Sequence, residues 1–200
     1  MSYVFVGWLI ACGGEPTVAP SVPEPAPPEA AVPVEDAEAA RAKEAQAAIQ
    51  ALGKDLKGRL IEQMQQGGPA AAVDVCGKEA QARTQRIAET TGIQVGRASS
   101  RLRNPKNQGP AWVQEWLEQH GEEGVGDGKP QVFEATANGA KVVRVVKPIP
   151  VAAPCLACHG NTEQISADVK AYLADHYAED QAVGYAVGDL RGVFWAEATL

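Results

Sequence analysis

The chain has 200 residues, of which 45% are hydrophobic and 22% charged, enough for one domain with a sizeable core. Its formal net charge of −7 argues against binding to nucleic acids and against peripheral attraction to anionic lipids, because both need a basic face. No apolar run approaches the roughly 18 residues of a transmembrane helix. We therefore expect a domain that does not span a membrane.

The first residues have a pattern typical of an export signal. The apolar run from Tyr3 ends in Leu9-Ile10-Ala11-Cys12, which resembles the lipobox of bacterial lipoproteins. Residues 1–11 are thus predicted as a lipoprotein-type signal peptide, with Cys12 as the lipidated residue. The alternatives are an ordinary secretory signal peptide or a frayed apolar terminus, since the run is short and no Lys or Arg precedes it. The lipoprotein interpretation predicts the periplasmic side of a bacterial membrane, inner or outer.

Residues 12–36 are predicted as a tether. Few large apolar side chains occur there, and seven prolines interrupt any helix: Pro16, Pro20, Pro23, Pro25, Pro27, Pro28 and Pro33. Such a composition favours extended polyproline II structure and makes a semi-rigid spacer. The lipid anchor would then be the only contact of the folded domain with the membrane.

From Glu38 onward the sequence favours helices. An apolar stripe at steps of three and four residues predicts the first amphipathic helix: Ala45, Ile49, Leu52, Leu56, Leu60 and Met64. Gly67-Gly68-Pro69 ends this helix and starts a second one, from Pro69 to Thr90, which carries Cys76 on its apolar face. Gly92 closes the second helix.

The rest of the chain alternates strands with two more helices. The predicted elements are a strand at 93–98, a helix from Pro110 to His120, strands at 131–137 and 140–147, a helix at 166–177, and strands at 185–186 and 190–199. Asn138-Gly139 between two strands is the strongest short hairpin signal. Helices followed by mostly antiparallel strands predict an α+β domain over residues 37–200.

The run Cys155-Leu156-Ala157-Cys158-His159 is the attachment signature of c-type haem. The two thiols add across the porphyrin vinyl groups, and two intervening residues separate the sulfur atoms correctly. A histidine directly after the second cysteine brings its imidazole under the iron. We therefore predict one covalently bound haem c, attached through Cys155 and Cys158, with His159 as an axial ligand.

Three other interpretations of the cysteines remain open. Cys155 and Cys158 could form a thioredoxin-like dithiol, although that motif needs no histidine behind it. They could form a structural disulfide, which an exported protein allows. Cys76, Cys155, Cys158 and His159 could instead bind zinc, but the adjacent Cys158 and His159 would both have to reach one metal ion.

With these residues in view, the chain resembles the PAS-like domains of unknown function that bind one haem c with His and Cys as axial ligands. Five segments carry the resemblance: Val95 to Ser100, Arg103-Asn104-Pro105 with Asn107 and Trp112, Lys147-Pro148-Ile149, Cys155 to Gly160, and Gly188-Asp189-Leu190-Arg191-Gly192. They span nearly all of the predicted domain. The resemblance implies N-terminal helices packed on a PAS-like antiparallel sheet, with a haem-binding loop.

The resemblance also implies that a cysteine of the helical region is the second iron ligand, and Cys76 is at that position. Arg101 and Arg103 are candidates to neutralise the haem propionates, because a planar guanidinium suits a carboxylate. The alternative for both arginines is a role as surface charges or in stabilising turns.

The residues alone leave four candidates for the second ligand: Met64, Cys76, His120 and His176, each on the apolar side of a predicted helix. Base rates for cytochromes favour Met or His. The cysteine count favours Cys76, because Cys12 is assigned to lipid and the motif uses two others. An odd thiol in an oxidising compartment needs an explanation, and iron coordination protects it.

We therefore expect an exported, membrane-tethered monohaem cytochrome that transfers electrons to an unidentified redox partner protein. A thiolate ligand favours Fe(III), so the potential should be low. The alternative is a redox or gas sensor, which would act through a separate partner because no output segment follows Leu200 here. A lesser alternative is a structural domain holding zinc or a disulfide. With both axial positions filled, we expect no enzyme activity.

Overall fold

The computed structural model describes Met1 and residues 34–121 and 124–200. Cys12, the predicted signal peptide and all of the predicted tether before residue 34 lie outside this range. The helical elements are α1 (Val34–Asp74), the π-helical turn η1 (Val75–Glu79), α2 (Ala80–Thr91), the 3-10 turn η2 (Pro105–Asn107), α3 (Ala111–His120), the 3-10 turn η4 (Ala153–Cys155), α4 (Leu156–His159) and α5 (Ala167–His176). The strands are β1 (Gln94–Ala98), β2 (Gln131–Ala137), β3 (Ala140–Pro150) and β4 (Leu190–Thr199).

The four strands form one antiparallel sheet in the order β1-β4-β3-β2. The hairpin of β2 and β3 turns at Asn138 and Gly139, both with positive φ (52° and 81°), as the sequence predicts. β4, the last strand in the chain, inserts between β1 and β3. This insertion brings the end of β1 beside the start of β4, where Ala98 pairs with Val193.

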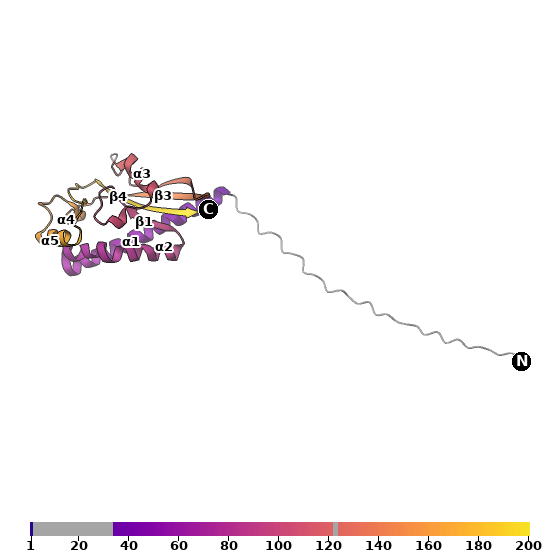
Figure 1. Cartoon of the computed structure of the whole chain (residues 1–200), viewed down its shortest axis with the longest axis horizontal. Helices are drawn as coiled ribbons and strands as arrows, with labels where there is room; N and C mark the ends of the chain where they lie inside the picture. Colours follow the sequence, from indigo (N-terminus) through magenta and orange to yellow (C-terminus); the bar gives the residue numbers. More distant parts are fainter. Residues whose placement is uncertain (2–33, 122–123) are drawn as a thin grey trace. The chain divides into compact units, whose positions relative to one another are not determined.

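One face of the sheet is covered by α1 and α2, and the other by α3 (Figure 1). The first contact is wholly apolar: residues of the two helices pack against alternate residues of β1, β3 and β4. Its buried members include Ala45, Ile49, Leu52, Leu56, Val95, Val143, Val145 and Ala196. Such alternation is what an antiparallel strand with two covered faces requires.

The predicted first helix is confirmed, but its apolar stripe is buried for only part of its length. Leu56 is buried, whereas Leu60 is 36% exposed and Met64 is half-buried, because the sheet covers only the first half of α1. The helix begins at Val34, inside the predicted tether. Gly68 leaves the helical geometry, so the predicted break before Pro69 is present.

The second predicted helix runs from Pro69 to Thr91 but is not regular. A single π-helical turn, Val75–Glu79, interrupts it, and Gly92 closes it in the left-handed conformation. π-helical turns are rare in proteins and occur frequently at functional sites. Cys76 lies in this turn.

The predicted strand at 185–186 is wrong. The amide of Tyr185 donates to the carbonyl of His159 (2.9 Å), and the amide of Ala186 donates to the carboxylate of Asp189 (2.8 Å). These residues form a loop because their partners are a short helix and a side chain rather than another strand. The predicted strand at 190–199 is confirmed as β4.

The predicted α+β class with an antiparallel sheet is confirmed. Across residues 34–121 and 124–200, no helix is both long enough and apolar enough to cross a bilayer. The cysteine motif lies at the end of the molecule that α4 and α5 form, near the break in the long N-terminal helices (Figure 1).

Candidate functional site

The cysteine motif begins in a 3-10 turn and ends in one short helical turn. Cys155 closes η4 and Cys158 lies in α4, and both are free thiols in partly buried positions. Each thiol has apolar neighbours, with Cys155 beside Val151 and Cys158 beside Val73. Burial raises the pKa of Cys158 to about 11; Arg103 opposes this rise, and Cys76 and Cys155 add to it. Cys158 therefore stays a neutral thiol near pH 7.

His159 has a fixed tautomer. Its Nδ1 lies 2.7 Å from the carbonyl oxygen of Ala182, and because a carbonyl only accepts, Nδ1 carries the proton. The lone pair is then on Nε2. The pKa of His159 is lowered to about 3, first by burial and then by the charges of Arg191, Arg103 and Arg101, while the bond to Ala182 opposes the change. A neutral imidazole with Nδ1 bonded to a carbonyl is the usual form of a histidine that binds a metal.

Arg191, which sequence reasoning did not single out, points at this lone pair. Its Nε lies 3.5 Å from Nε2 of His159, and its Nη1 donates to Ser99 Oγ at 2.9 Å. The neighbouring Gly192 lets β4 lie close to the end of β1, because a Cβ at that position would overlap the carbonyl oxygen of Ala98. The Nε2 lone pair cannot accept from Arg191 and bind iron at once, so iron binding requires this guanidinium to turn away.

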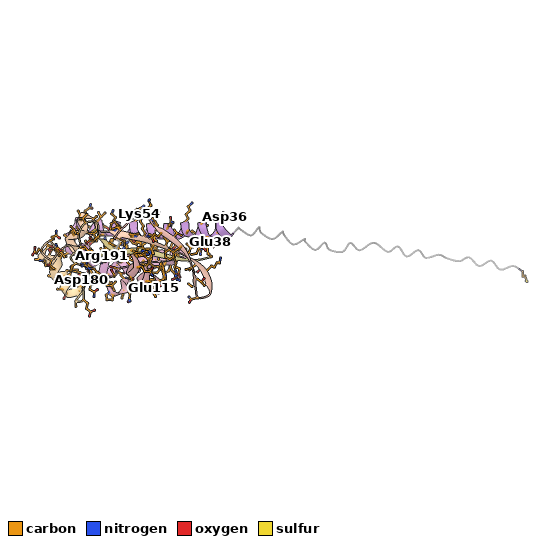
Figure 2. The ribbon with its side chains drawn as sticks, turned by 90° about the horizontal axis from the view of Figure 1, so that it is seen from above. Asp36, Glu38, Lys54, Glu115, Asp180 and Arg191 are labelled. Carbon is orange, nitrogen blue, oxygen red and sulfur yellow. The ribbon has the colours of Figure 1, made fainter. Side chains whose placement is uncertain are left out.

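Arg103 is buried in an ion pair. Its Nε donates to Asp180 at 3.0 Å, and the side chains of Arg103 and Asp180 are only 6% and 10% exposed. Nη2 of the same guanidinium donates to the carbonyls of Cys158 (2.6 Å) and Ala182 (3.2 Å). Arg103 thus binds the cysteine motif to the loop that also holds His159. Asp180 and Arg191 both belong to the end of the molecule away from Asp36 (Figure 2).

Arg101 is bonded to the same loop. Its Nε donates to the carbonyl of Gln181 at 3.1 Å, its Nη2 donates to that of Val183, and its guanidinium stacks on Tyr185 at 4.1 Å. Tyr185 in turn contacts the edge of the His159 ring. The contact of Arg101 and Arg103 with haem propionates stays a prediction, and the hydrogen bonds described above are to protein groups.

Arg97 differs from both. Its Nε is buried and has no hydrogen-bond partner among the described residues. It lies near Arg191, whose pKa is lowered first by burial and then partly by the charges of Arg103 and Arg97. We call Arg97, Arg101, Arg103 and Arg191 the arginine cluster. A buried donor without a partner is costly, and three guanidiniums near one imidazole, with Arg97 near Arg191, favour an anionic ligand.

Cys76 lies on the other side of the motif, in the π-helical turn that follows Asp74. Val73, one turn earlier, packs against Cys158, Val169 and Tyr177. A thiolate at Cys76 would be close enough to raise the pKa values of Cys158 and Arg191. The fold therefore brings Cys76 and the Cys155–His159 motif together, although about 80 residues separate them in sequence.

The other three candidate ligands have different surroundings. His120 stacks on Trp116, which belongs to the core between α3 and the sheet face opposite α1 and α2. His176 is exposed and stacks on Tyr172, and its Nδ1 contacts the Tyr172 carbonyl at 3.0 Å. Met64 is half-buried in α1, four residues before the break at Gly68.

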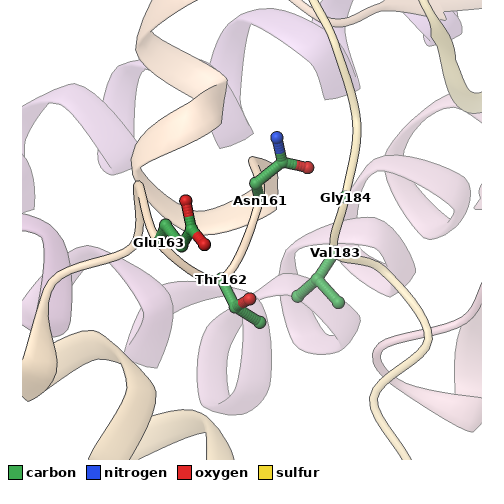
Figure 3. A pocket seen from close by; sticks show the side chains of 5 residues that line it. All are labelled: Asn161, Thr162, Glu163, Val183 and Gly184. Atoms are coloured by element: carbon green, nitrogen blue, oxygen red, sulfur yellow. The ribbon is translucent and has the colours of Figure 1, made fainter.

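Cys76, Cys155 and Cys158 form no disulfide. In the described part of the chain, no group of three or more His, Cys, Asp or Glu residues is arranged to hold a metal ion. A shallow pocket of about 330 Å³ adjoins the motif (Figure 3). It is lined by Asn161, Thr162, Glu163, Val183 and Gly184 and contains none of the predicted site residues.

A family model described as Tll0287-like matches residues 29–197, which is most of the chain. The chain belongs to the Tll0287-like family. A solved structure described as the crystal structure of the cyanobacterial heme-protein Tll0287 is 25% identical, with a TM-score of 0.55. The alignment covers 84% of this chain and 97% of that one, so the two share their fold. A comparison with curated proteins gave no match.

The residues present fit a haem of the kind that the cysteine motif predicts. Two free thiols are separated by two residues, and the adjacent histidine is neutral with its lone pair on Nε2. The orphaned Nε of Arg97 and the charge of the arginine cluster suit carboxylates such as the propionates. Arg97 and Arg191 both lie in segments that carry the family resemblance, but no local pattern assigned them a role.

Proposed function

We propose that this Tll0287-like chain is a c-type monohaem protein that carries electrons. Its haem would be bound through Cys155 and Cys158, with His159 and Cys76 as the two axial ligands. The observation that carries this proposal is the tautomer of His159: its Nδ1 proton is held by the Ala182 carbonyl, and its Nε2 lone pair becomes available to a metal once Arg191 turns away. The haem supplies reversible one-electron chemistry when bound.

The chain's own residues would do the remaining work. Arg103 and Asp180 hold the motif and the 180–183 loop in one position, which fixes the imidazole ring. Arg97 is the guanidinium best placed to bind a propionate, because its Nε has no partner to give up among the described residues. Cys158 and His159 are half-buried, which would limit the access of water to the haem when it is bound. A thiolate at Cys76 would lower the potential.

The test is EPR and absorption spectroscopy of the oxidised protein, with Cys76→Ala beside the wild type. We expect a low-spin His/thiolate signal in the wild type. In Cys76→Ala the iron should become high-spin or change its ligand, while the haem stays covalently bound under denaturing conditions. A Cys155→Ser/Cys158→Ser variant should lose covalent haem altogether. An unchanged spectrum in Cys76→Ala would remove Cys76 from the site.

Carbon monoxide separates a carrier from a gas sensor. A six-coordinate carrier whose axial ligands are held firmly should show no prompt spectral change when the reduced protein meets CO. Prompt binding would favour a sensor in which the gas displaces an axial group. The π-helical turn around Cys76 is where we would expect such a displacement to begin, since π-helical turns are rare and occur frequently at functional sites.

We also propose that the protein is exported and tethered through Cys12. The support is the sequence Leu9-Ile10-Ala11-Cys12, together with the periplasmic assembly that a c-type haem requires. Metabolic labelling with palmitate should mark the wild type and not Cys12→Ser. Label that persists in Cys12→Ser would exclude this residue as the anchor.

A further inference from the structure

Tyr177 has a buried hydroxyl group without a partner. Its Oη is fully covered, yet it makes no hydrogen bond to any described residue. The residue follows the last turn of α5, and its ring packs beside Val73 and Cys158. Burial of an unpaired hydroxyl is destabilising, so the position of this group needs an explanation.

The hydroxyl lies directly against the π-helical turn that contains Cys76. A Cβ on Gly77 would overlap Oη of Tyr177, and it would also lie 3.4 Å from Cζ of the ring. The chain therefore has glycine beside the proposed ligand, and the hydroxyl takes the place of a side chain. Burial raises the pKa of Tyr177, and the nearby Cys76 is the second cause of the rise.

We infer that Tyr177 donates a hydrogen bond to the sulfur of Cys76 when Cys76 binds iron as a thiolate. A neutral thiol is a weak acceptor, whereas a thiolate is a charged and strong one. The hydroxyl thus gains its partner only in the loaded protein. This inference rests on the proposed function, because it needs Cys76 on the iron.

The bond would set the redox potential. A donor to the sulfur draws charge away from the iron, so it stabilises the electron-rich ferrous state more than the ferric state. Tyr177 is then a positioning and tuning residue that acts through Cys76. Its loss should leave the ligands in place and lower the potential.

The experiment is a redox titration of the haem-loaded full chain, with EPR on each sample. Tyr177→Phe should keep the low-spin thiolate signal and lower the midpoint potential by about 59 mV. For one electron this shift equals a tenfold change in the ferric-to-ferrous ratio. Tyr172→Phe is the matched control, because it removes a hydroxyl of α5 that donates to Asp74. Its potential should equal that of the wild type.

A double-mutant cycle separates a bond to sulfur from a general effect on packing. In a Cys76→Met background the sulfur is uncharged, so Tyr177→Phe should leave the potential unchanged. A shift that persists in this background, or a potential that does not move in Tyr177→Phe while the thiolate signal is present, overturns the inference alone. If the wild type lacks a thiolate signal, the proposed function fails first.

Discussion

Two parts of the domain differ in the kind of side chain that they bury. Between the sheet and the helices α1 and α2, the buried residues of the core are apolar and pack against one another. Around His159 the buried groups are arginines, an aspartate and a serine, held in loops rather than in strands. The first region is complete without any further partner. The second contains Arg97 and Tyr177, whose buried polar atoms are unpaired among the described residues.

The comparison indicates which part of the fold binds a ligand. An apolar core is stabilised by the apolar surface that folding removes from water. The free energy of unfolding lost on a substitution there depends on the volume of side chain removed. A buried polar cluster is stable only when each charge is paired. The free energy lost on a substitution there depends on which charged group remains buried without its partner. Unpaired donors in such a cluster indicate a group that completes it. The following variants test this difference.

The largest effect is expected at the buried ion pair. Arg103→Leu leaves the carboxylate of Asp180 buried without its cation, which should lower the free energy of unfolding by about 3–5 kcal/mol. Urea denaturation of the haem-loaded chain measures this change. Arg103→Leu combined with Asp180→Leu should lose less than Arg103→Leu alone. A loss under 1 kcal/mol in Arg103→Leu would contradict the paired burial of these two residues.

A substitution in the apolar core should be costly but local. Leu52→Ala removes a fully buried side chain between α1 and the sheet, which should cost about 2–5 kcal/mol. The haem spectrum should stay that of the wild type, because Leu52 belongs to the other region. A changed axial-ligand signal in Leu52→Ala would show that the two regions are coupled.

The third prediction concerns pH and uses a haem-free background, Cys155→Ser/Cys158→Ser. The pKa of His159 falls from 6.5 to about 3 on folding, so between these values only the unfolded chain binds the proton. Stability is then complete above pH 6.5 and falls with decreasing pH, by about 1.4 kcal/mol per unit. Urea titrations at pH 7 and pH 5 should differ by about 2 kcal/mol. His159→Gln should remove most of this difference, and an equal slope in that variant would contradict the assignment.

The smallest effect is expected at Arg97. In the haem-free background Arg97→Gln should change the free energy of unfolding by less than about 1 kcal/mol, because no hydrogen bond to a described residue is lost. In the haem-loaded chain the same substitution should cost about 1.5–3 kcal/mol, the value of a hydrogen bond to a charged group. Equal costs in the two forms would exclude a propionate contact.

Local patterns in the sequence were enough to predict most of the fold. The spacing of apolar residues predicted α1 and α2, Gly67-Gly68-Pro69 predicted the break, and Asn138-Gly139 predicted the hairpin. These signals act over a few residues, because helix periodicity and turn geometry are properties of the local backbone. The segment 185–186 was wrongly predicted as a strand, because the amide of Tyr185 bonds to the distant His159 and that of Ala186 to the side chain of Asp189.

The sequence by itself likewise determined the chemistry of attachment, because Cys155, Cys158 and His159 are adjacent in the chain. Only the tertiary structure decided the surroundings that give these residues their properties. The tautomer of His159 depends on Ala182, the pairing of Arg103 depends on Asp180, and the free Nε of Arg97 depends on the absence of any such partner among the described residues. Each of these facts follows from the insertion of β4 beside β1 and from the loop before it. Burial and hydrogen-bond pairing are set by contacts across 20 to 80 residues, and no local pattern encodes them.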